Sequence, residues 1–260
     1  MKVREVMTTD LITVDKDRNL KDVLHVMQQN NVTKLPVVDA DGNLLGIVTD
    51  GRIADKLGRA HNKDIQTGTL RASSVMEKDF LLAHPDEPLD TLLKDVGRPG
   101  PTMVPVVQGK RLVGVITKSD LLPFVESTQR IGDIMRREVQ AVEAGERLVH
   151  ARRLLIDHDI ARLPVLAGGH VEGIIAEHEI ANAFAGFKEA DGHVQKAMIR
   201  EMHVGDWMKR DVITAGPDMS CTDAAARMRE HHVGALPVVD GDGTIQGIVT
   251  RTDLIRTYAS

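Results

Sequence analysis

The chain has 260 residues, a formal net charge of −5, 42% apolar residues and only 2% aromatic residues. This mild negative charge argues against the basic face that nucleic acids and anionic membranes require, and no apolar run is long enough to span a bilayer. The first residues, MKVREVMTTD, contain no apolar signal sequence, and a single cysteine cannot form an internal disulfide, so we expect a cytoplasmic protein.

The first predicted elements are a short strand and an amphipathic helix. The β-branched run Leu11–Val14 favours a strand. Asn19 is suited to cap a helix, and apolar residues follow at helical spacing from Leu20 to Met27. We therefore predict a helix from about residue 20 to residue 30.

A hairpin and a second helix come next. Pro36–Val38 and Gly46–Val48 are apolar strands, and Asp39–Asn43 between them is typical of a turn. Ile53 and Leu57 then lie on the apolar face of a second helix. The predicted order is β-α-β-β-α, which belongs to the α/β (α+β) class.

This order occurs four times along the chain. Each copy begins with a methionine that is followed three residues later by an acid: Met7, Met76, Met135 and Met208. Each hairpin begins at a proline that precedes a glycine by nine or ten residues: Pro36, Pro105, Pro164 and Pro237. An internal repeat of roughly 60 residues decides the fold, and the length allows about two domains. In the second copy, Pro99 and Pro101 should end the first helix early.

With these motifs in this order, the chain resembles the CBS-domain family, whose modules are named after cystathionine β-synthase. The resemblance covers almost the whole chain and implies four repeats, at residues 1–58, 72–126, 127–187 and 202–260. CBS domains usually pair through their sheets into Bateman modules, so the resemblance implies one module at 1–126 and another at 127–260. The plan is similar to that of the regulatory gamma subunit of AMP-activated kinase, which also has four tandem repeats.

The resemblance directs attention to the turn from the last strand of each repeat into its last helix. In the CBS family this turn reads Ser/Thr-x-x-Asp, with the hydroxyl near a phosphate and the Asp accepting hydrogen bonds from the ribose hydroxyls. Repeat 2 keeps this pattern with Thr117 and Asp120, and repeat 4 keeps it with Thr250 and Asp253. The resemblance therefore implies adenosine sites at repeats 2 and 4.

Repeats 1 and 3 depart from the family pattern. Repeat 1 has Arg52 in place of the Asp, and a guanidinium cannot accept a hydrogen bond. Repeat 3 has Ala176 in place of the hydroxyl residue and the longer Glu179 in place of the Asp. We therefore do not expect these two repeats to bind the same ligand.

A capping box, which begins an ordinary helix, has the same Ser/Thr-x-x-acid spacing. In repeats 2 and 4 the threonine is followed by Lys118 and Arg251, whereas repeats 1 and 3 have Asp50 and Glu177 at that position. A cation in the first turn opposes the helix dipole, and a bound phosphate would explain it. Both interpretations, cap and ligand site, stay open at this point.

The resemblance places the adenine half of each site between the first strand and the segment before the hairpin proline. In repeat 2 these residues are Phe80, Leu81, Met103, Val104 and Pro105. In repeat 4 they are Val212, Ile213, Ala235, Leu236 and Pro237. The same side chains are explained equally well as core.

Other reactive side chains fit structural roles. No two histidines lie at i, i+4 with an acid between them, so we expect no metal site. Cys221 lies on an apolar helix face with Ala224 and Met228 and fits a small buried residue. Pairs such as Arg136–Arg137 fit solvated faces, with the alternative that one pair reaches a phosphate bound at a neighbouring repeat. The chain has no P-loop and no nucleophile–base set, so we predict neither an enzyme nor a required cofactor.

The sequence therefore predicts a non-catalytic sensor that binds an adenine nucleotide, AMP foremost, and passes its occupancy to a protein partner. One alternative is a binder of S-adenosylmethionine or methylthioadenosine, which need no phosphate contact. Another is a ligand-free scaffold that recruits a partner protein. We expect a monomer or homodimer that binds neither nucleic acid nor membrane.

Overall fold

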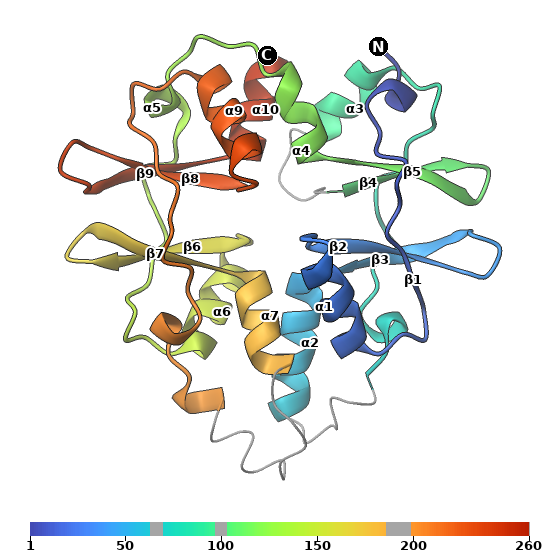
Figure 1. The fold of residues 1–260 in the computed structure, drawn as a ribbon, viewed down its shortest axis with the longest axis horizontal. Coiled ribbons are helices and arrows are strands. Elements are labelled where there is room, and N and C mark those ends of the chain that lie inside the picture. Colours follow the sequence, from blue (N-terminus) through green and yellow to red (C-terminus); the bar gives the residue numbers. More distant parts are fainter. Residues whose placement is uncertain (63–69, 97–102, 186–198, 260) are drawn as a thin grey trace. The chain divides into compact units, whose positions relative to one another are not determined.

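The computed structural model describes residues 1–62, 70–96, 103–185 and 199–259, and the chain forms two compact units (Figure 1). Unit 1 comprises Met1–Leu11, Asp79–Val139 and Ile213–Ser260. Unit 2 comprises Ile12–Lys78 and Gln140–Val212. Unit 1 thus contains most of repeats 2 and 4, and unit 2 most of repeats 1 and 3. The pairing of repeat 1 with 2 and of repeat 3 with 4 stays a prediction.

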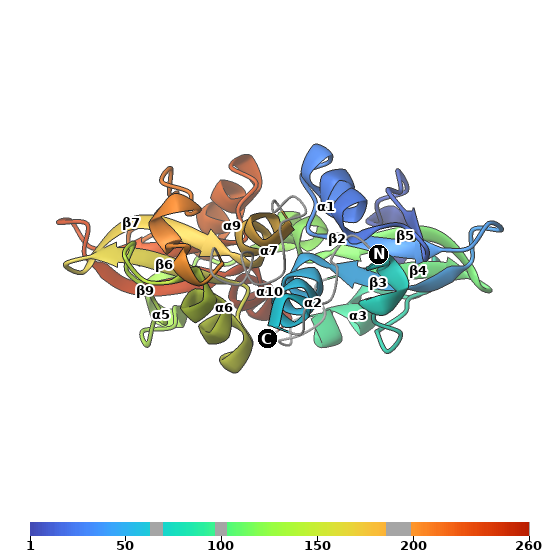
Figure 2. The same ribbon diagram turned by 90° about the horizontal axis from the view of Figure 1, so that it is seen from below.

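Unit 2 has two small sheets, and its two last helices lie side by side (Figures 1 and 2). From repeat 1 it contains β1 (Val14–Asp15), α1 (Leu20–Gln29), β2 (Lys34–Val38), β3 (Leu44–Thr49) and α2 (Asp50–Asn62). From repeat 3 it contains α6 (Leu148–Asp157), β6 (Arg162–Ala167), β7 (His170–Ala176) and α7 (Glu177–Ala185). The short turns η3 (Ala72–Ser74) and η5 (Val204–Asp206) complete it. The side-by-side helices are α2 and α7.

Unit 1 has the same plan, built on two antiparallel hairpins. From repeat 2 it contains α3 (Leu89–Val96), β4 (Met103–Gln108), β5 (Arg111–Thr117), α4 (Lys118–Leu121) and η4 (Leu122–Phe124). From repeat 4 it contains α9 (Cys221–Glu230), β8 (Ala235–Val239), β9 (Ile245–Thr250) and α10 (Arg251–Ala259). The 3-10 helix η1 (Val3–Glu5) and the short α-helix α5 (Ile131–Ile134) complete it.

The local signals of the sequence explain most of these boundaries. The side chain of Asn19 accepts a hydrogen bond from the backbone of Lys21 and caps α1, as predicted. The predicted first strand is wrong in extent, because β1 covers only Val14–Asp15 and pairs in parallel with β2. In the other three repeats a single bridging residue takes its place: Ala83, Val142 and Ala215.

Repeat 2 is the irregular copy, as predicted, but its last helix is also altered. Its first helix, α3, has 8 residues, whereas α1, α6 and α9 have 10 each. Pro99 and Pro101 lie outside the described residues. Its last helix stops after 4 residues and continues as a 3-10 turn that contains Pro123, because proline cannot donate the next helical hydrogen bond.

Each of the two units has its own aliphatic core. One cluster of buried residues fills unit 2, and it includes Met27 and Phe184. Two further clusters fill unit 1, one around Cys221 and Met228 in repeat 4 and one around Leu92 in repeat 2. The prediction that Cys221 is a small buried residue is confirmed, since it is fully buried.

The recurring methionines and glycines are explained by the segment around the first methionine of each repeat, here called its lead segment. Repeats 1 and 2 exchange their lead segments, and so do repeats 3 and 4, so that each methionine packs on a glycine of the other repeat. Met7, from the lead segment of repeat 1, packs on Gly114 of repeat 2, and a Cβ on that glycine would lie 2.5 Å from the Met7 sulfur. The backbone of the next residue, Thr8, then exchanges two hydrogen bonds with Val115. The same exchange brings Met76 to Gly46, Met208 to Gly173 and Met135 to Gly247. Each glycine is therefore required for close packing.

Candidate functional site

The four turns from last strand to last helix differ in charge and hydrogen-bonding groups between the repeats. They lie at the junctions β3/α2, β5/α4, β7/α7 and β9/α10. The two turns that keep the family pattern, in repeats 2 and 4, both lie in unit 1.

In repeat 2, Asp120 is held by its own turn. Its Oδ2 accepts hydrogen bonds from the backbone nitrogen and the hydroxyl of Thr117, at 2.7 and 2.8 Å. The capping interpretation is therefore correct for this oxygen. The other oxygen, Oδ1, faces the lead segment of repeat 1, where the Thr8 hydroxyl donates from 3.4 Å. Since each carboxylate oxygen has two lone-pair positions, Oδ1 retains acceptor capacity.

Asp253 of repeat 4 has the same geometry, with arginines in place of Thr8. Its Oδ2 accepts from the backbone nitrogen and hydroxyl of Thr250, at 2.9 and 2.6 Å. Its Oδ1 lies 3.7 Å from the Nε of Arg136 and 3.8 Å from an Nη of Arg256. Asp253 is only 5% exposed, whereas both arginine side chains are 48% exposed. Asp253 is therefore a buried carboxylate with two half-exposed cationic side chains within 4 Å of its Oδ1.

In repeat 1 an ion pair occupies the position of the family Asp. Arg52 donates from its Nε to an oxygen of Glu77 at 2.5 Å. Glu77 follows Met76 in the lead segment of repeat 2. The chain itself thus supplies the partner of this residue.

Repeat 3 uses the same arrangement with the charges reversed. Glu179 accepts from the backbone nitrogen of Ala176 at 3.1 Å, and its other oxygen lies 3.1 Å from the Lys209 ammonium group. Lys209 follows Met208 in the lead segment of repeat 4.

The sequence analysis named Arg136 as a cation that could reach a neighbouring repeat, but it did not predict that the residue after every lead methionine contacts a turn. In all four repeats this residue faces the last residue of a turn in the repeat with which the lead segment is exchanged. One member of each pair is a carboxylate, and the other is a hydroxyl or a cation. The pairs are Thr8 with Asp120, Glu77 with Arg52, Arg136 with Asp253 and Lys209 with Glu179. When the last residue of the turn changes from an acid to Arg52, the residue after the methionine changes to the acid Glu77. This paired change between copies was the signal that could have identified the contact.

The cations of unit 1 have protein contacts, which corrects the argument that they need a phosphate. Lys118 is buried, and its ammonium group donates to the hydroxyl of Thr252 in the turn of repeat 4, at 2.7 Å. Arg251 donates to the backbone oxygen of Val233 at 3.1 Å. Their positions in the first helical turn are therefore not evidence for a bound anion by themselves.

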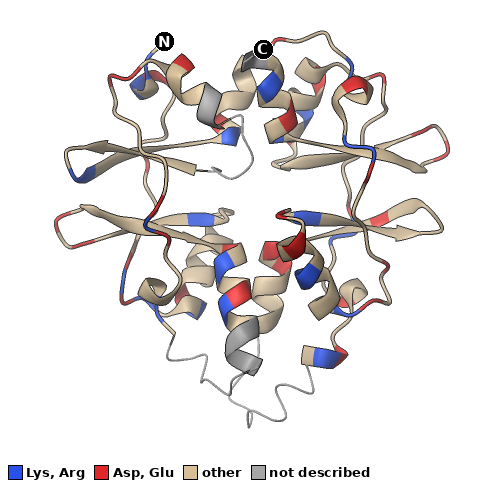
Figure 3. Ribbon diagram, turned by 180° about the vertical axis from the view of Figure 1, so that it is seen from behind, with Lys and Arg blue, Asp and Glu red and all other residues tan. Residues whose placement is uncertain are grey.

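In unit 2 the same position of the turn carries two buried or half-buried acids. Asp50 is buried, and burial raises the pKa of its carboxyl group. Burial and the neighbouring Asp50 raise the pKa of Glu177 to about 7. The Glu177 carboxylate lies against Gly51, where a Cβ would be too close to it. Figure 3 shows residues of both charge signs on the paired helices of this unit.

The predicted adenine-facing residues fall into two groups. Val104, Pro105, Ala235, Leu236 and Pro237 are buried. Phe80, Leu81, Met103, Val212 and Ile213 are half-buried and leave some surface for a ligand. All belong to unit 1 except Val212, the last residue of unit 2.

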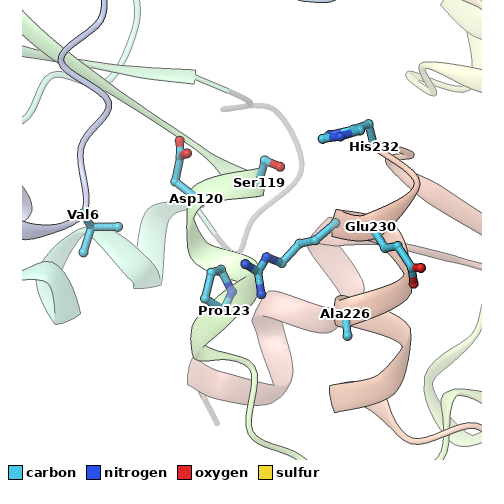
Figure 4. Close-up of a pocket in the computed structure, with 8 residues that line it drawn as sticks. Val6, Ser119, Asp120, Pro123, Ala226, Glu230 and His232 are labelled. Carbon is cyan, nitrogen blue, oxygen red and sulfur yellow. The ribbon is translucent and has the colours of Figure 1, made fainter.

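An open pocket of about 670 Å³ adjoins Asp120 within unit 1 (Figure 4). Its lining comes from three segments: Val6 of the first lead segment, Ser119, Asp120 and Pro123 of repeat 2, and Ala226, Arg229, Glu230 and His232 of repeat 4. The volume lies within the range of small-molecule sites, roughly 300–1,000 Å³.

Two properties of the described residues concern metal binding and membrane insertion. Among them, no group of three or more His, Cys, Asp or Glu side chains is arranged to hold a metal ion. None of the helices that the structure describes combines the length and hydrophobicity needed to cross a membrane.

Comparison with known proteins identifies the class. The family model of the CBS domain matches residues 3–59, 72–127, 131–186 and 204–260, so the chain belongs to the CBS-domain family. The four repeats and the mixed α/β fold predicted from the sequence are confirmed.

Particular relatives share the four-repeat plan. Protein MJ1225 of Methanocaldococcus jannaschii is 30% identical over 273 residues, which span 96% of this chain and 95% of that protein. Its crystal structure has a TM-score of 0.87 to this chain at 27% identity, covers 98% of this chain and 99% of its own, and is described as a proposed archaeal homologue of g-AMPK. Protein MJ1404 of the same organism is 28% identical over 99% of this chain and 62% of its own length. A conserved protein from Pyrococcus horikoshii, at 22% identity and a TM-score of 0.63, shares the fold.

Proposed function

We propose that this protein is a non-catalytic regulatory sensor that binds adenine nucleotides at the turns of repeats 2 and 4, with AMP as the foremost ligand and ADP and ATP as further ones. The observation that carries the proposal is the state of Asp120 and Asp253. Each carboxylate is fixed through Oδ2 by its own turn and keeps Oδ1 for further donors. A ribose diol supplies two such donors.

The surroundings of these carboxylates favour an anionic ligand. Half-exposed guanidinium groups of Arg136 and Arg256 lie within 4 Å of Asp253. These side chains reach a phosphate by changing rotamer, and charge-assisted hydrogen bonds to phosphate are strong. The description of the similar protein MJ1225 as a proposed g-AMPK homologue also supports an adenine nucleotide and a role in energy sensing.

Regulation follows if two conformations of unit 1 bind the ligand with different affinity. Nucleotide binding then shifts their populations, and a protein partner that recognises one of them reads the occupancy. We propose a cytoplasmic protein, monomeric or homodimeric, that acts through such a partner.

Two rivals make different predictions. S-adenosylmethionine or methylthioadenosine would use the ribose contacts of Asp120 and Asp253 but would present no phosphate to the arginines near Asp253. A ligand-free scaffold would keep both turns as plain helix caps, since both caps are formed.

Thermal unfolding with AMP, ADP, ATP, S-adenosylmethionine and GMP separates the three. A site of about 10 μM affinity saturated with 1 mM nucleotide adds about 2.7 kcal/mol of stability, so AMP should raise Tm and GMP should not. A larger shift with S-adenosylmethionine would favour the first rival. No shift with any adenosine derivative would favour the scaffold and overturn the proposal.

A further inference from the structure

Each lead segment presents one side chain to the last residue of a turn, and its backbone fixes where that side chain starts. Thr8 exchanges two backbone hydrogen bonds with Val115 of β5, at 2.9 and 3.0 Å. Lys209 exchanges two with Ile174 of β7, at 2.8 and 2.9 Å. The backbone of the lead residue is thus held in the same way in both repeats, so its side chain decides what meets the turn.

In repeat 3 this side chain occupies the acid of the turn. One oxygen of Glu179 accepts from the backbone nitrogen of Ala176, as Oδ2 of Asp120 accepts from Thr117. The other oxygen lies 3.1 Å from the Lys209 ammonium group. The Glu179 side chain is 11% exposed and the Lys209 side chain is 67% exposed, so the lysine lies on the solvent side of the carboxylate. An incoming hydroxyl group would have to displace a charge-assisted hydrogen bond.

In repeat 2 the same position carries a short and uncharged side chain. Thr8 is exposed, and its hydroxyl lies 3.4 Å from Oδ1 of Asp120. Hydrogen bonds between oxygens are usually shorter, roughly 2.5–3.0 Å, so this contact is weak and easily replaced. Repeat 4 is intermediate, because the Nε of Arg136 lies 3.7 Å from Oδ1 of Asp253, beyond ordinary hydrogen-bonding distance.

We propose that the residue after a lead methionine decides whether the acid of the turn it faces is open to a ligand, and that Thr8 is the specificity-determining residue that keeps repeat 2 open. An ammonium group at this position takes the carboxylate oxygen that a ribose diol would use, whereas the threonine hydroxyl gives it up. This inference rests on the proposed function and deepens it. Repeat 3 also lacks the turn hydroxyl, and Arg162 interacts electrostatically with Glu179. The decisive change is therefore made in repeat 2, where the lead residue alone is altered.

Calorimetric titration of the full chain with AMP and with adenosine tests this. Thr8→Lys copies the lead residue of repeat 4, which closes repeat 3, and should weaken AMP at one of the two sites by about tenfold or more. Adenosine should be weakened by a similar factor, because the competition is for the ribose contact. Thr8→Arg, which copies the longer contact of Arg136, should weaken both ligands less.

Two controls separate occupancy of the carboxylate from other effects of the substitution. Thr9→Lys adds the same charge to an exposed neighbour in the same lead segment and should keep both sites. Thr8→Met has a similar length without the charge and should also keep both. Thermal melts without ligand check that each variant is folded.

Combination with Asp120→Ala assigns the effect to repeat 2. If the new lysine acts on Asp120, adding Thr8→Lys to Asp120→Ala should not weaken the remaining site. Parental or tighter AMP binding by folded Thr8→Lys, an equal loss in Thr8→Met, or further weakening in the double variant would overturn the inference and leave the proposed function intact. Failure of the parent protein to bind AMP would instead overturn the proposed function and this inference with it.

Discussion

The two units carry opposite charges at the same position of the same turn. In unit 2 the second residue of the turn is Asp50 or Glu177, whereas in unit 1 it is Lys118 or Arg251. Both units bring two such turns together in similar ways. In unit 2 the Glu177 carboxylate lies against Gly51, and in unit 1 the Lys118 ammonium group donates to Thr252. In both units, therefore, the second residue of one turn contacts the third residue of the other turn.

The units also differ in where the counter-charge comes from. In unit 2, Lys34 and Arg162 begin β2 and β6 and interact electrostatically with the two acids. At the matching positions unit 1 has Met103 and Ala235, which carry no charge. Unit 2 thus sets cations of its own strands beside the acids of its turns, whereas the matching strand positions of unit 1 are uncharged and its turns keep two carboxylates. This difference agrees with our proposal that the ligand binds at unit 1.

The largest expected effect comes from removing a counter-charge in unit 2. Arg162→Met should lower the free energy of unfolding by about 3 kcal/mol at neutral pH, because the carboxyl groups of Asp50 and Glu177 lose a cation that stabilises their charged forms. Urea unfolding measures it. Arg162→Lys, which keeps the charge, should lose much less. Equal stability of Arg162→Met and the parent protein would show that the ion cluster does not hold unit 2.

Unit 2 should also respond to pH through Glu177. The pKa of Glu177 is raised from 4.5 to about 7 in the folded protein. A carboxyl group with a raised pKa contributes stability that is fully present below its unfolded pKa and lost as pH rises through its folded pKa. Glu177→Gln should therefore be more stable than the parent protein above pH 7, by up to about 3 kcal/mol.

The pH window supplies the control for this prediction. The advantage of Glu177→Gln should shrink as pH falls through 7 and be small by about pH 4.5. Glu230→Gln, which changes an exposed acid of unit 1, should show no such trend. A stability difference that is independent of pH would contradict the buried, proton-binding state of Glu177.

A smaller effect should accompany loss of the caps in unit 1. Asp120→Ala and Asp253→Ala should each lower the free energy of unfolding by about 1 kcal/mol, because each Asp bonds the backbone of its own turn. Thermal melts without ligand measure this. Unchanged melting would mean that the caps contribute nothing to stability.

The smallest effect is expected at the ion pair of repeat 1. Arg52 is 58% exposed and Glu77 is 32% exposed, so Arg52→Ala should cost less than about 1 kcal/mol. Nucleotide binding by this variant should be unchanged. A loss of binding would place a ligand at repeat 1 and remove the distinction between the units.

Local features were predicted from the sequence because they depend on neighbours in the chain. The hairpins, the Asn19 cap and the short first helix of repeat 2 follow from periodicity, cap residues and prolines. The exchange of lead segments could not be read from one copy, because Met7 and Gly114 lie far apart in the sequence. The proximity of Asp50 and Glu177 was not predicted for the same reason, since nothing local indicates that their turns meet.

The candidate site was predicted in part. Thr117, Asp120, Thr250 and Asp253 lie where the family pattern implies, and each pair forms the cap that the spacing allows. Arg136 was named only as one of several cations that could reach a neighbouring repeat, and the α9 side of the pocket was not predicted, because both come from other segments of the chain.

Counting AMP sites by calorimetry tests the distinction between the units most directly. Our account predicts two sites in the parent protein, one in Asp120→Ala, one in Asp253→Ala and none in the folded double variant. Each lost site should be weakened by at least about tenfold, since hydrogen bonds to a charged group contribute about 1.5–3 kcal/mol. Glu179→Ala and Arg52→Ala should keep both sites. Binding at parental affinity by the double variant, or loss of a site in Arg52→Ala, would contradict the account.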